Sequence, residues 1–394
     1  MKKILLVAVA TMMSTSVYAS KARLAALQNA AHVTDIQSIL TNPANIAVLG
    51  EWGTFEFGTG TNTMGESAGY NKSTNSGHEG GFAKAMGSNY MGLYLGHQSN
   101  AIALSRGTGN GFVDNTAIGG SNLSAYAVLS EENPFELFYG QKAEMSWGAS
   151  LFYSNSDKKS ANKKQNSMGV RVGAATENWG GYFHMGLANN AKTTAAGADG
   201  EVKGKMSAKL GGSYTLDKNL FFYGSYSMTG FKSNIGSTDV TDWDITLIDI
   251  GVIDSMKKDG TNFFYGVSYH MDTLKQNQGT AKKSEASYMP FILGVEHDAN
   301  SWLVLRTSLT QNVLLGTIKD ETRALTGATT ATTDADTYNM STVVAAGVGI
   351  KFNKMILDAT LKAAGNGGNI GTDAGAAGGA DNNFLGTASL TYMF

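Results

Sequence analysis

Phe384-Leu385-Gly386-Thr387-Ala388-Ser389-Leu390-Thr391-Tyr392-Met393-Phe394 is the last stretch of the chain, and its residues alternate with a period of two. One face is apolar with aromatic rings at both ends, and the other carries mainly hydroxyl groups. A strand of a soluble sandwich can alternate in the same way. However, about ten residues with aromatic rings at both ends are typical of a tilted strand that crosses a bilayer. The stretch therefore predicts a transmembrane β-barrel.

The end of this strand resembles the C-terminal signature of bacterial outer-membrane proteins, in which a terminal Phe follows the last strand. Phe394 and Tyr392 are the residues that carry the resemblance. It implies that the barrel-assembly machinery reads this signal. It also implies that the protein resides in the bacterial outer membrane, in contact with lipid and lipopolysaccharide.

The start of the chain has the features of a secretory signal peptide over residues 1–19. Lys2 and Lys3 precede an apolar run from residue 4 to 13, and small residues prepare a cleavage site after Ala19. No stretch is long and apolar enough to predict a spanning helix. Without the two lysines the chain has 28 basic and 32 acidic residues, a formal charge of -4. This mild charge indicates no nucleic-acid partner.

The composition favours one barrel over residues 51–394. The chain has no Cys, which excludes disulfides and thiol chemistry. It has 49 Gly and 3 Pro, as expected for many strands and turns without a Pro-rich linker. Charged residues make up 16%, below the usual quarter of a soluble protein, which suits a surface that faces lipid.

Alternation and turn residues predict sixteen strands. They are 51–59, 87–97, 100–106, 121–130, 144–154, 165–175, 179–188, 203–215, 219–231, 242–253, 261–272, 286–297, 301–311, 341–352, 354–363 and 384–394. Short turns alternate with long loops if residues 131–143 form a somewhat long turn, as a transmembrane barrel requires. Residues 131–143 are the weakest part of this assignment. If 100–106 is also misassigned, the count falls to fourteen.

Residues 20–50 form the part of the mature chain without strand alternation. The motif Asn42-Pro43-Ala44, followed by a Gly and then the first strand, resembles the long-chain fatty-acid transporter (FadL) family. The resemblance implies fourteen strands, a hatch formed by this segment inside the barrel, and transport of a hydrophobic substrate. A periplasmic segment ahead of the first strand is the alternative.

Alternation also predicts which side chains line the lumen. Basic residues on the lipid face at mid-depth would each cost about 2–4 kcal/mol, so we expect them to face inward. The predicted lining residues are Arg171, Lys205, Lys209, Arg306 and Ser308.

These residues leave three functions open. A hydrated lumen predicts a porin for small hydrophilic solutes, biased towards anions if the basic groups are not paired with inward acids such as Asp358. A plugged lumen predicts the FadL-like transporter. A structural or adhesive surface barrel is the third alternative, and the oligomeric state remains open.

No catalytic or metal site is expected. The six His residues show no ligand spacing on a recognisable helix. No Ser, His and acid on neighbouring strands form a recognisable triad pattern. We therefore predict a protein without enzymatic activity, cofactor or metal.

Overall fold

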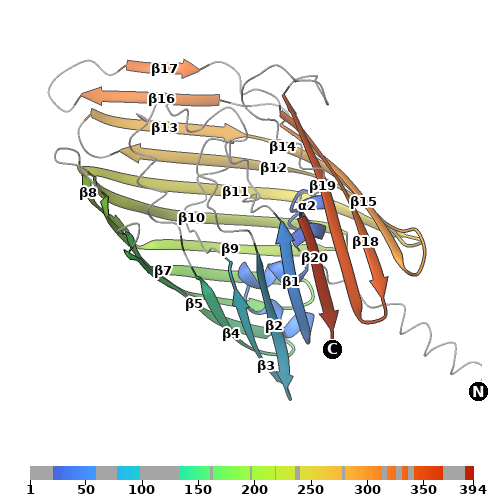
Figure 1. The fold of residues 1–394 in the computed structure, drawn as a ribbon. Coiled ribbons are helices and arrows are strands. Elements are labelled where there is room, and N and C mark those ends of the chain that lie inside the picture. Colours follow the sequence, from blue (N-terminus) through green and yellow to red (C-terminus); the bar gives the residue numbers. More distant parts are fainter. Residues whose placement is uncertain are drawn as a thin grey trace, which may run out of the picture.

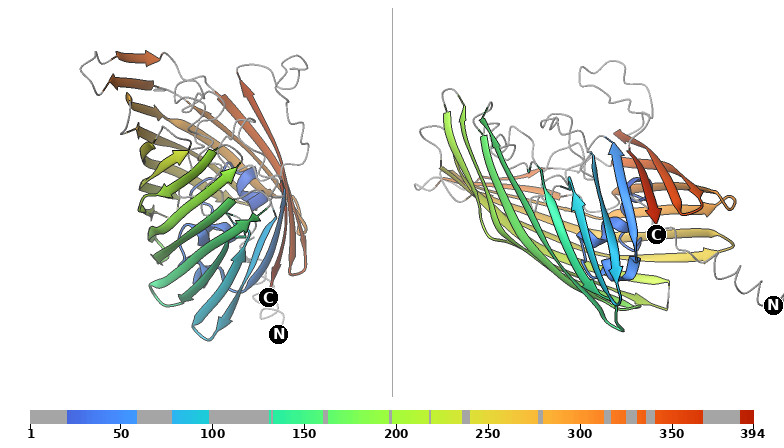
Figure 2. Two further views of the ribbon diagram at one scale, coloured as in Figure 1. Left: turned by 60° about the vertical axis from the view of Figure 1, so that its left-hand side comes forward. Right: turned by 60° about the horizontal axis from the view of Figure 1, so that its bottom comes forward.

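The computed structural model describes residues 21–58, 78–97, 131, 133–159, 163–195, 198–217, 219–235, 240–276, 280–312, 317–324, 331–335, 341–366 and 387–394. These residues form one strongly curved antiparallel sheet that closes on itself (Figures 1 and 2). No helix among them is both long and apolar enough to span a membrane.

The wall is built from twenty strand segments in chain order. They are β1 (Trp52–Gly58), β2 (Glu79–Met86), β3 (Asn89–Leu95), β4 (Phe135–Gln141), β5 (Ser146–Lys158), β6 (Lys163–Ala175), β7 (Trp179–Ala195), β8 (Ala198–Gly204), β9 (Ser207–Leu216), β10 (Leu220–Ile235), β11 (Val240–Lys258), β12 (Thr261–Gln276), β13 (Thr280–Tyr288), β14 (Pro290–Asp298), β15 (Leu303–Asn312), β16 (Thr317–Ala324), β17 (Ala331–Ala335), β18 (Ser341–Phe352), β19 (Met355–Asn366) and β20 (Thr387–Met393).

Sixteen strands close the barrel, which confirms the predicted fold class and strand number. Four wall strands each consist of two successive segments, namely β8 with β9, β13 with β14, β15 with β16, and β17 with β18. The ring closes because β1 pairs antiparallel with both β2 and β20, with Trp52 opposite Ala83 and Met393. The fourteen-strand alternative is therefore wrong.

Two members of the predicted set differ from the observed strands. β2 lies within a predicted long loop, and β4 lies within the predicted turn at residues 131–143. Both are short and pair with β3, which places a two-residue turn between β2 and β3. The predicted strands 100–106 and 121–130 lie outside the described residues. Among the described residues, β2 and β4 complete the sixteen strands of the ring.

Several strands extend beyond their predicted ends, β7, β10 and β12 on the side of the long loops and β11 mainly on the side of the short turns. β7, β10, β11 and β12 have 16 to 19 residues each. Alternation does not reveal these extensions because both of their faces carry polar residues. At the end opposite to the long loops the turns are tight. Asp259 and Gly260 both have positive φ, as a two-residue hairpin turn that follows the strand twist requires.

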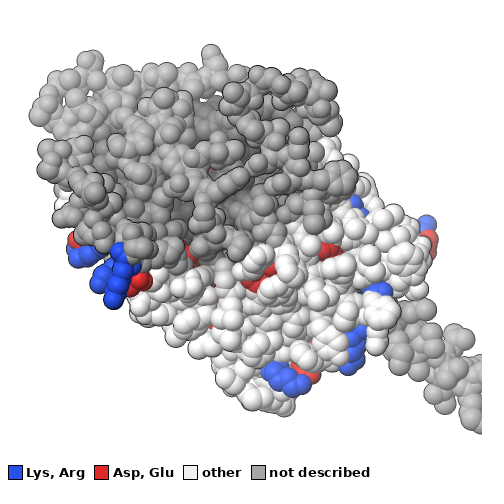
Figure 3. Space-filling model, in the orientation of Figure 1, with Lys and Arg blue, Asp and Glu red and all other residues white. Residues whose placement is uncertain are grey.

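The outer surface of the wall carries a band of exposed apolar side chains. Leu95, Leu137, Leu151, Leu210, Ile250 and Leu305 each expose between 41% and 62% of their surface. In Figure 3 the described part of this face is mostly uncharged, with charged side chains gathered along its edges. Such a band is expected where a barrel contacts hydrocarbon.

Three short helices precede the wall and lie inside it (Figure 2). They are α2 (Lys21–Ala26), the 3-10 helix η1 (Ile36–Leu40) and α3 (Asn45–Leu49). We call residues 21–50 the N-terminal segment. α2 contacts β15, β18, β19 and β20, whereas α3 contacts β3, β4 and β5. The segment therefore touches widely separated parts of the inner wall.

Candidate functional site

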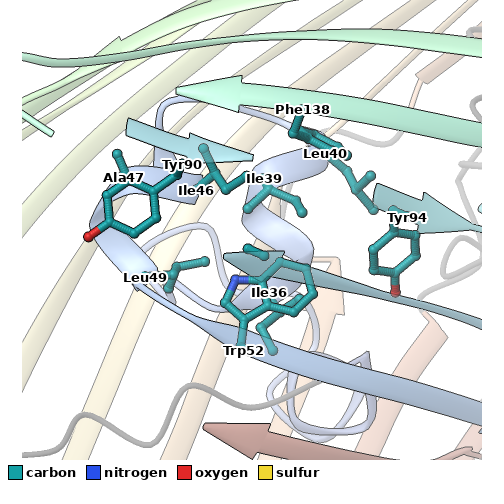
Figure 4. Close-up of a cluster of buried hydrophobic side chains, with 11 residues drawn as sticks. Ile36, Ile39, Leu40, Ile46, Ala47, Leu49, Trp52, Tyr90, Tyr94 and Phe138 are labelled. Carbon is teal, nitrogen blue, oxygen red and sulfur yellow. The ribbon is translucent and has the colours of Figure 1, made fainter. Parts of the chain in front are cut away.

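The second half of the N-terminal segment forms a hydrophobic core with the barrel wall (Figure 4). Ile36, Ile39 and Ile46 expose 1% or less of their surface. They pack with wall residues of β1 to β4, comprising Trp52, Ala83, Tyr90, Tyr94 and Phe138. A core of this kind holds the segment by apolar burial, the main favourable term in folding.

A second apolar cluster joins the first half of the segment to the opposite wall. Leu27 and Ala30 are buried against Ile253 of β11 and Phe264 of β12. The ring centroid of His32 lies 4.6 Å from that of Phe264. Both halves of the segment thus bury apolar groups on the inner wall.

Asn42, Pro43 and Ala44 are buried against inward-facing glycines. The Asn42 side-chain amide donates to the Ala174 carbonyl at 3.0 Å, while its oxygen accepts from the Ala44 N–H at 3.1 Å. A Cβ on Gly148 would lie 2.4 Å from the Pro43 carbonyl oxygen. A Cβ on Gly173 would lie 2.0 Å from the Asn42 side-chain oxygen. The motif therefore lies so close to the wall that a side chain larger than that of glycine at position 148 or 173 would collide with it.

A buried chain of four charges links the segment to the wall. Arg23 donates to both carboxylate oxygens of Glu296 on β14, each at 2.8 Å. Arg306 on β15 donates to Glu296 at 2.6 Å and to Asp358 on β19 at 2.5 Å. Two cations and two anions balance one another. Bidentate arginine–carboxylate pairs are among the stronger and more directional hydrogen bonds in proteins.

Wall hydroxyl groups satisfy the backbone of α2. Ser308 donates its hydroxyl to the Ala26 carbonyl at 2.6 Å, and Thr360 donates to the Ala22 carbonyl. The Ala22 N–H donates to the Ser389 oxygen at 3.2 Å. A helix of six residues leaves most of its backbone groups without internal partners. The polar inner wall supplies partners that water would otherwise provide.

Buried acidic residues of the first strands also contact the segment. Lys21 lies 3.4 Å from Glu79, and its backbone N–H donates to Glu56 at 3.2 Å. The Gln37 side chain donates to the Tyr94 hydroxyl at 2.6 Å. Strands β1 to β3 therefore hold the segment by polar contacts as well as by the apolar core.

Burial also controls ionisation within the segment. Burial, assisted by the positive charge of Arg23, lowers the pKa of His32 to about 4. Burial raises the pKa of Asp35 well above its usual value, and Arg23 partly opposes this shift. Asp35 caps η1 by accepting from the Gln37 N–H at 2.9 Å. His32 is thus neutral at physiological pH.

The two predicted lining arginines face the interior and are neutralised there. Arg171 on β6 is buried and lies 2.7 Å from Glu136 on β4. Its guanidinium carbon lies 5.6 Å from the centre of the Phe152 ring. Arg306 belongs to the charge chain described above, and Ser308 holds α2. Arg171 and Arg306 therefore contact acidic side chains, and Ser308 contacts the N-terminal segment.

Lys209 lies in the lumen, where its ammonium group is 5.9 Å from the centre of the Tyr182 ring. Lys205 lies on the outer face, opposite to the predicted one. Its N–H donates to the Gly230 carbonyl, and its ammonium group lies 2.5 Å from Asp244. Gly230 and Asp244 are paired on the face opposite to that of the buried Phe231, and the Lys205 side chain lies on their face.

Lys205 lies on the outer face because the strand is irregular between β8 and β9. The pairing with β10 shifts by one residue between Gly204 opposite Phe231 and Ala208 opposite Met228. A shift of one residue exchanges the two faces of a strand. Alternation counted straight through this point therefore assigns Lys205 to the wrong face.

The residues of the C-terminal signature lie on the outside of the barrel. Tyr392 and Phe394 expose 40% and 54% of their surface, and their ring centroids are 5.1 Å apart. Met393 pairs with Trp52, so the last strand is held directly against the first. Phe384 lies outside the described residues.

Two groups of contact residues were not singled out from the sequence. One comprises Arg23 and Glu296, whose pairing joins positions 273 residues apart. The other comprises the inward glycines Gly148 and Gly173, which lie against the Asn42-Pro43-Ala44 motif. Glycine at an inward position can mark close approach of another backbone. That signal was available in the alternating pattern.

Comparisons with known proteins find no matching family model and no matching curated protein. OmpT, an outer membrane protein of Vibrio cholerae folded in vitro, matches with 11% identity and a TM-score of 0.37 over 87% of this chain and 95% of that one. A TodX monoaromatic hydrocarbon channel mutant matches with 10% identity and a TM-score of 0.35 over 91% and 94%. The translocator domain of the autotransporter NalP from Neisseria meningitidis matches with 10% identity and a TM-score of 0.29 over 87% and 88%. Such values assign neither a family nor an activity.

Proposed function

We propose that the protein is a bacterial outer-membrane transporter whose lumen is closed by the N-terminal segment and opens when that segment moves. The observation that carries this proposal is the docking of the segment on the inner wall through the Arg23–Glu296 pair. In this view the predicted signal peptide, residues 1–19, directs export. Phe394 and Tyr392 then serve insertion by the assembly machinery.

Small apolar or amphipathic compounds are the proposed substrates. The wall beneath the segment is apolar at two places, around Phe138 in β4 and around Ile253 and Phe264 in β11 and β12. Movement of the segment would uncover these side chains to whatever enters the lumen. An apolar solute would replace the contacts that the segment gives up, whereas water would not.

Diffusion of small hydrophilic solutes is the second candidate function. The inner faces of β5 and β6 carry a polar row, in which Ser154 donates to Gln165 at 3.1 Å. Ser154 and Gln165 each expose 1% or less of their surface, and this row would suit a hydrated path once it is uncovered. The ion pairs of Arg171 and Arg306 balance their charge, which argues against an anion filter built on them.

Planar-bilayer recordings of the folded protein test the gate. We expect low conductance for the intact protein and a large stable conductance after deletion of residues 21–45. Equal conductance of the two proteins would refute a closing role for the segment. Uptake into liposomes then separates the substrates. Faster uptake of a monoaromatic hydrocarbon than of a small sugar supports the first candidate, and the reverse supports the second.

A further inference from the structure

Three polar side chains on the inner faces of β11 and β12 have the arrangement of a hydrolytic triad. The Ser268 hydroxyl lies 2.9 Å from His270 Nε2. On the other side of the ring, His270 Nδ1 lies 3.2 Å from Asp249 Oδ1. Asp249 stands directly opposite His270 in the antiparallel ladder. A nucleophile within hydrogen-bond reach of a base, with a carboxylate within ion-pair distance of the other ring nitrogen of that base, is an arrangement used in nucleophilic catalysis.

The three residues lie on the inner face of the wall. Ser268 and His270 share the face of Phe264, and Asp249 shares the face of Ile253. Phe264 and Ile253 both pack on the N-terminal segment. Ser268 is four positions beyond Phe264, about 13 Å along the strand and away from the short turns. The triad thus faces the lumen above this contact with the segment.

Aromatic residues complete the surroundings of the triad. The ring of Tyr288, which pairs opposite His270 on β13, stacks on the imidazole with centroids 4.9 Å apart. Tyr223 on β10 reaches over Gly251, where a Cβ would lie 2.5 Å from the phenol oxygen. Gly251 pairs opposite Ser268, so the Tyr223 hydroxyl is directed towards β12. A phenol beside the nucleophile can donate to a developing oxyanion.

We propose that Ser268, His270 and Asp249 form a hydrolytic site for small carboxylic esters in the lumen. Ser268 attacks the ester carbonyl carbon and passes its proton to His270 Nε2, while Tyr223 donates to the carbonyl oxygen. The alcohol leaves with that proton as the old ester bond breaks. Water then attacks the acyl-serine, releases the carboxylic acid and restores the Ser268 hydroxyl. Asp249 orients the imidazole and balances its charge when it is protonated.

This activity is independent of the proposed gate, because labelling and ester hydrolysis are measured on folded protein in detergent without any membrane. The probe is a fluorophosphonate, which reacts covalently with activated serines. We expect one label per chain, mapped to Ser268 by mass spectrometry, and hydrolysis of p-nitrophenyl butyrate. Asp249→Asn should reduce both rates by roughly 100-fold or more, because the wrong imidazole tautomer is then favoured.

Ser268→Ala should abolish labelling and hydrolysis. The matched control is Ser150→Ala, which removes a hydroxyl of the inner wall that is buried to a similar extent and should leave both rates unchanged. Heat-modifiable electrophoretic mobility verifies that each variant is folded, and Ser268→Cys provides a second nucleophile should the alanine variant fail to fold. The proposal is overturned if folded wild-type protein is not labelled. Labelling that persists in folded Ser268→Ala would overturn it as well.

Discussion

Arg23 on the N-terminal segment and Glu296 on β14 form a bidentate ion pair, with two nitrogen–oxygen distances of 2.8 Å. The two side chains are largely buried, and Glu296 also accepts from Arg306. Neither charge could be desolvated favourably without its partner. The position of the segment inside the barrel therefore depends on a charge supplied by the wall.

Replacing Arg23 with Met should release the segment. Removal of one partner from a buried pair costs about 3 kcal/mol, so the released fraction should rise on the order of 100-fold. Single-channel recordings measure this as more frequent or longer openings. Lys192→Met is the matched control, because it removes an exposed ion pair with Glu201, which contributes little. Identical openings in wild type and Arg23→Met would exclude a latch at this position.

Gly148→Val should expel the Asn42-Pro43-Ala44 motif from the wall. The new Cβ would lie 2.4 Å from the Pro43 carbonyl oxygen, and the strand backbone cannot yield without breaking its ladder. Valine suits a strand, so the barrel itself should still form. Limited proteolysis of the segment should accelerate at least tenfold.

Gly181→Val is the control for the Gly148 substitution. A Cβ on Gly181 would meet its nearest atom at 3.8 Å, an ordinary contact. Proteolysis of this variant should match that of the wild type. If Gly148→Val is also cut at the wild-type rate, the motif is not wedged against β5.

Acidification should loosen the segment through His32. The pKa of this group is about 4 in the folded state because burial lowers it, compared with 6.5 for the unburied side chain. Stability from the neutral ring is thus present above pH 6.5 and is lost as the pH falls towards 4, by about 3 kcal/mol at most. Proteolysis of the segment across this range measures the loss.

His32→Phe isolates this contribution. Phenylalanine keeps a ring against Phe264 but cannot take up a proton. The difference in segment stability between wild type and variant should grow as the pH falls from 6.5 to 4. Asp35, whose pKa burial raises, acts in the opposite direction but is present in both proteins. Parallel pH curves would show that His32 has no part in the response.

Leu305→Arg should impair barrel assembly. Leu305 exposes 47% of its surface on the outer apolar band of β15. An arginine facing lipid near mid-depth costs about 2–4 kcal/mol. Folding yield into lipid vesicles, followed by electrophoretic mobility, should fall strongly for this variant and remain unchanged for Leu305→Met. An undiminished yield for the arginine variant would place Leu305 outside the hydrocarbon.

Most of the strands and most face assignments could be predicted because both follow from a local period. Leu305 and Arg306 alternate within one strand, and the cost of a charge in lipid decides which side each faces. The same procedure failed at Lys205, where one irregular residue pair reverses the faces. It also missed β2 and β4, which have only eight and seven residues.

The sequence by itself determined the alternating strands that predict a barrel, such as residues 384–394, because alternation of apolar and polar residues is a property of neighbouring positions. The tertiary structure alone decided what the lumen holds. Arg23 meets Glu296, Pro43 meets Gly148, and His270 meets Asp249 because the fold of the wall and the register of its strands bring these positions together. The contacts of Arg23 and Pro43 depend on the closure of the whole ring around the N-terminal segment, which no local pattern encodes.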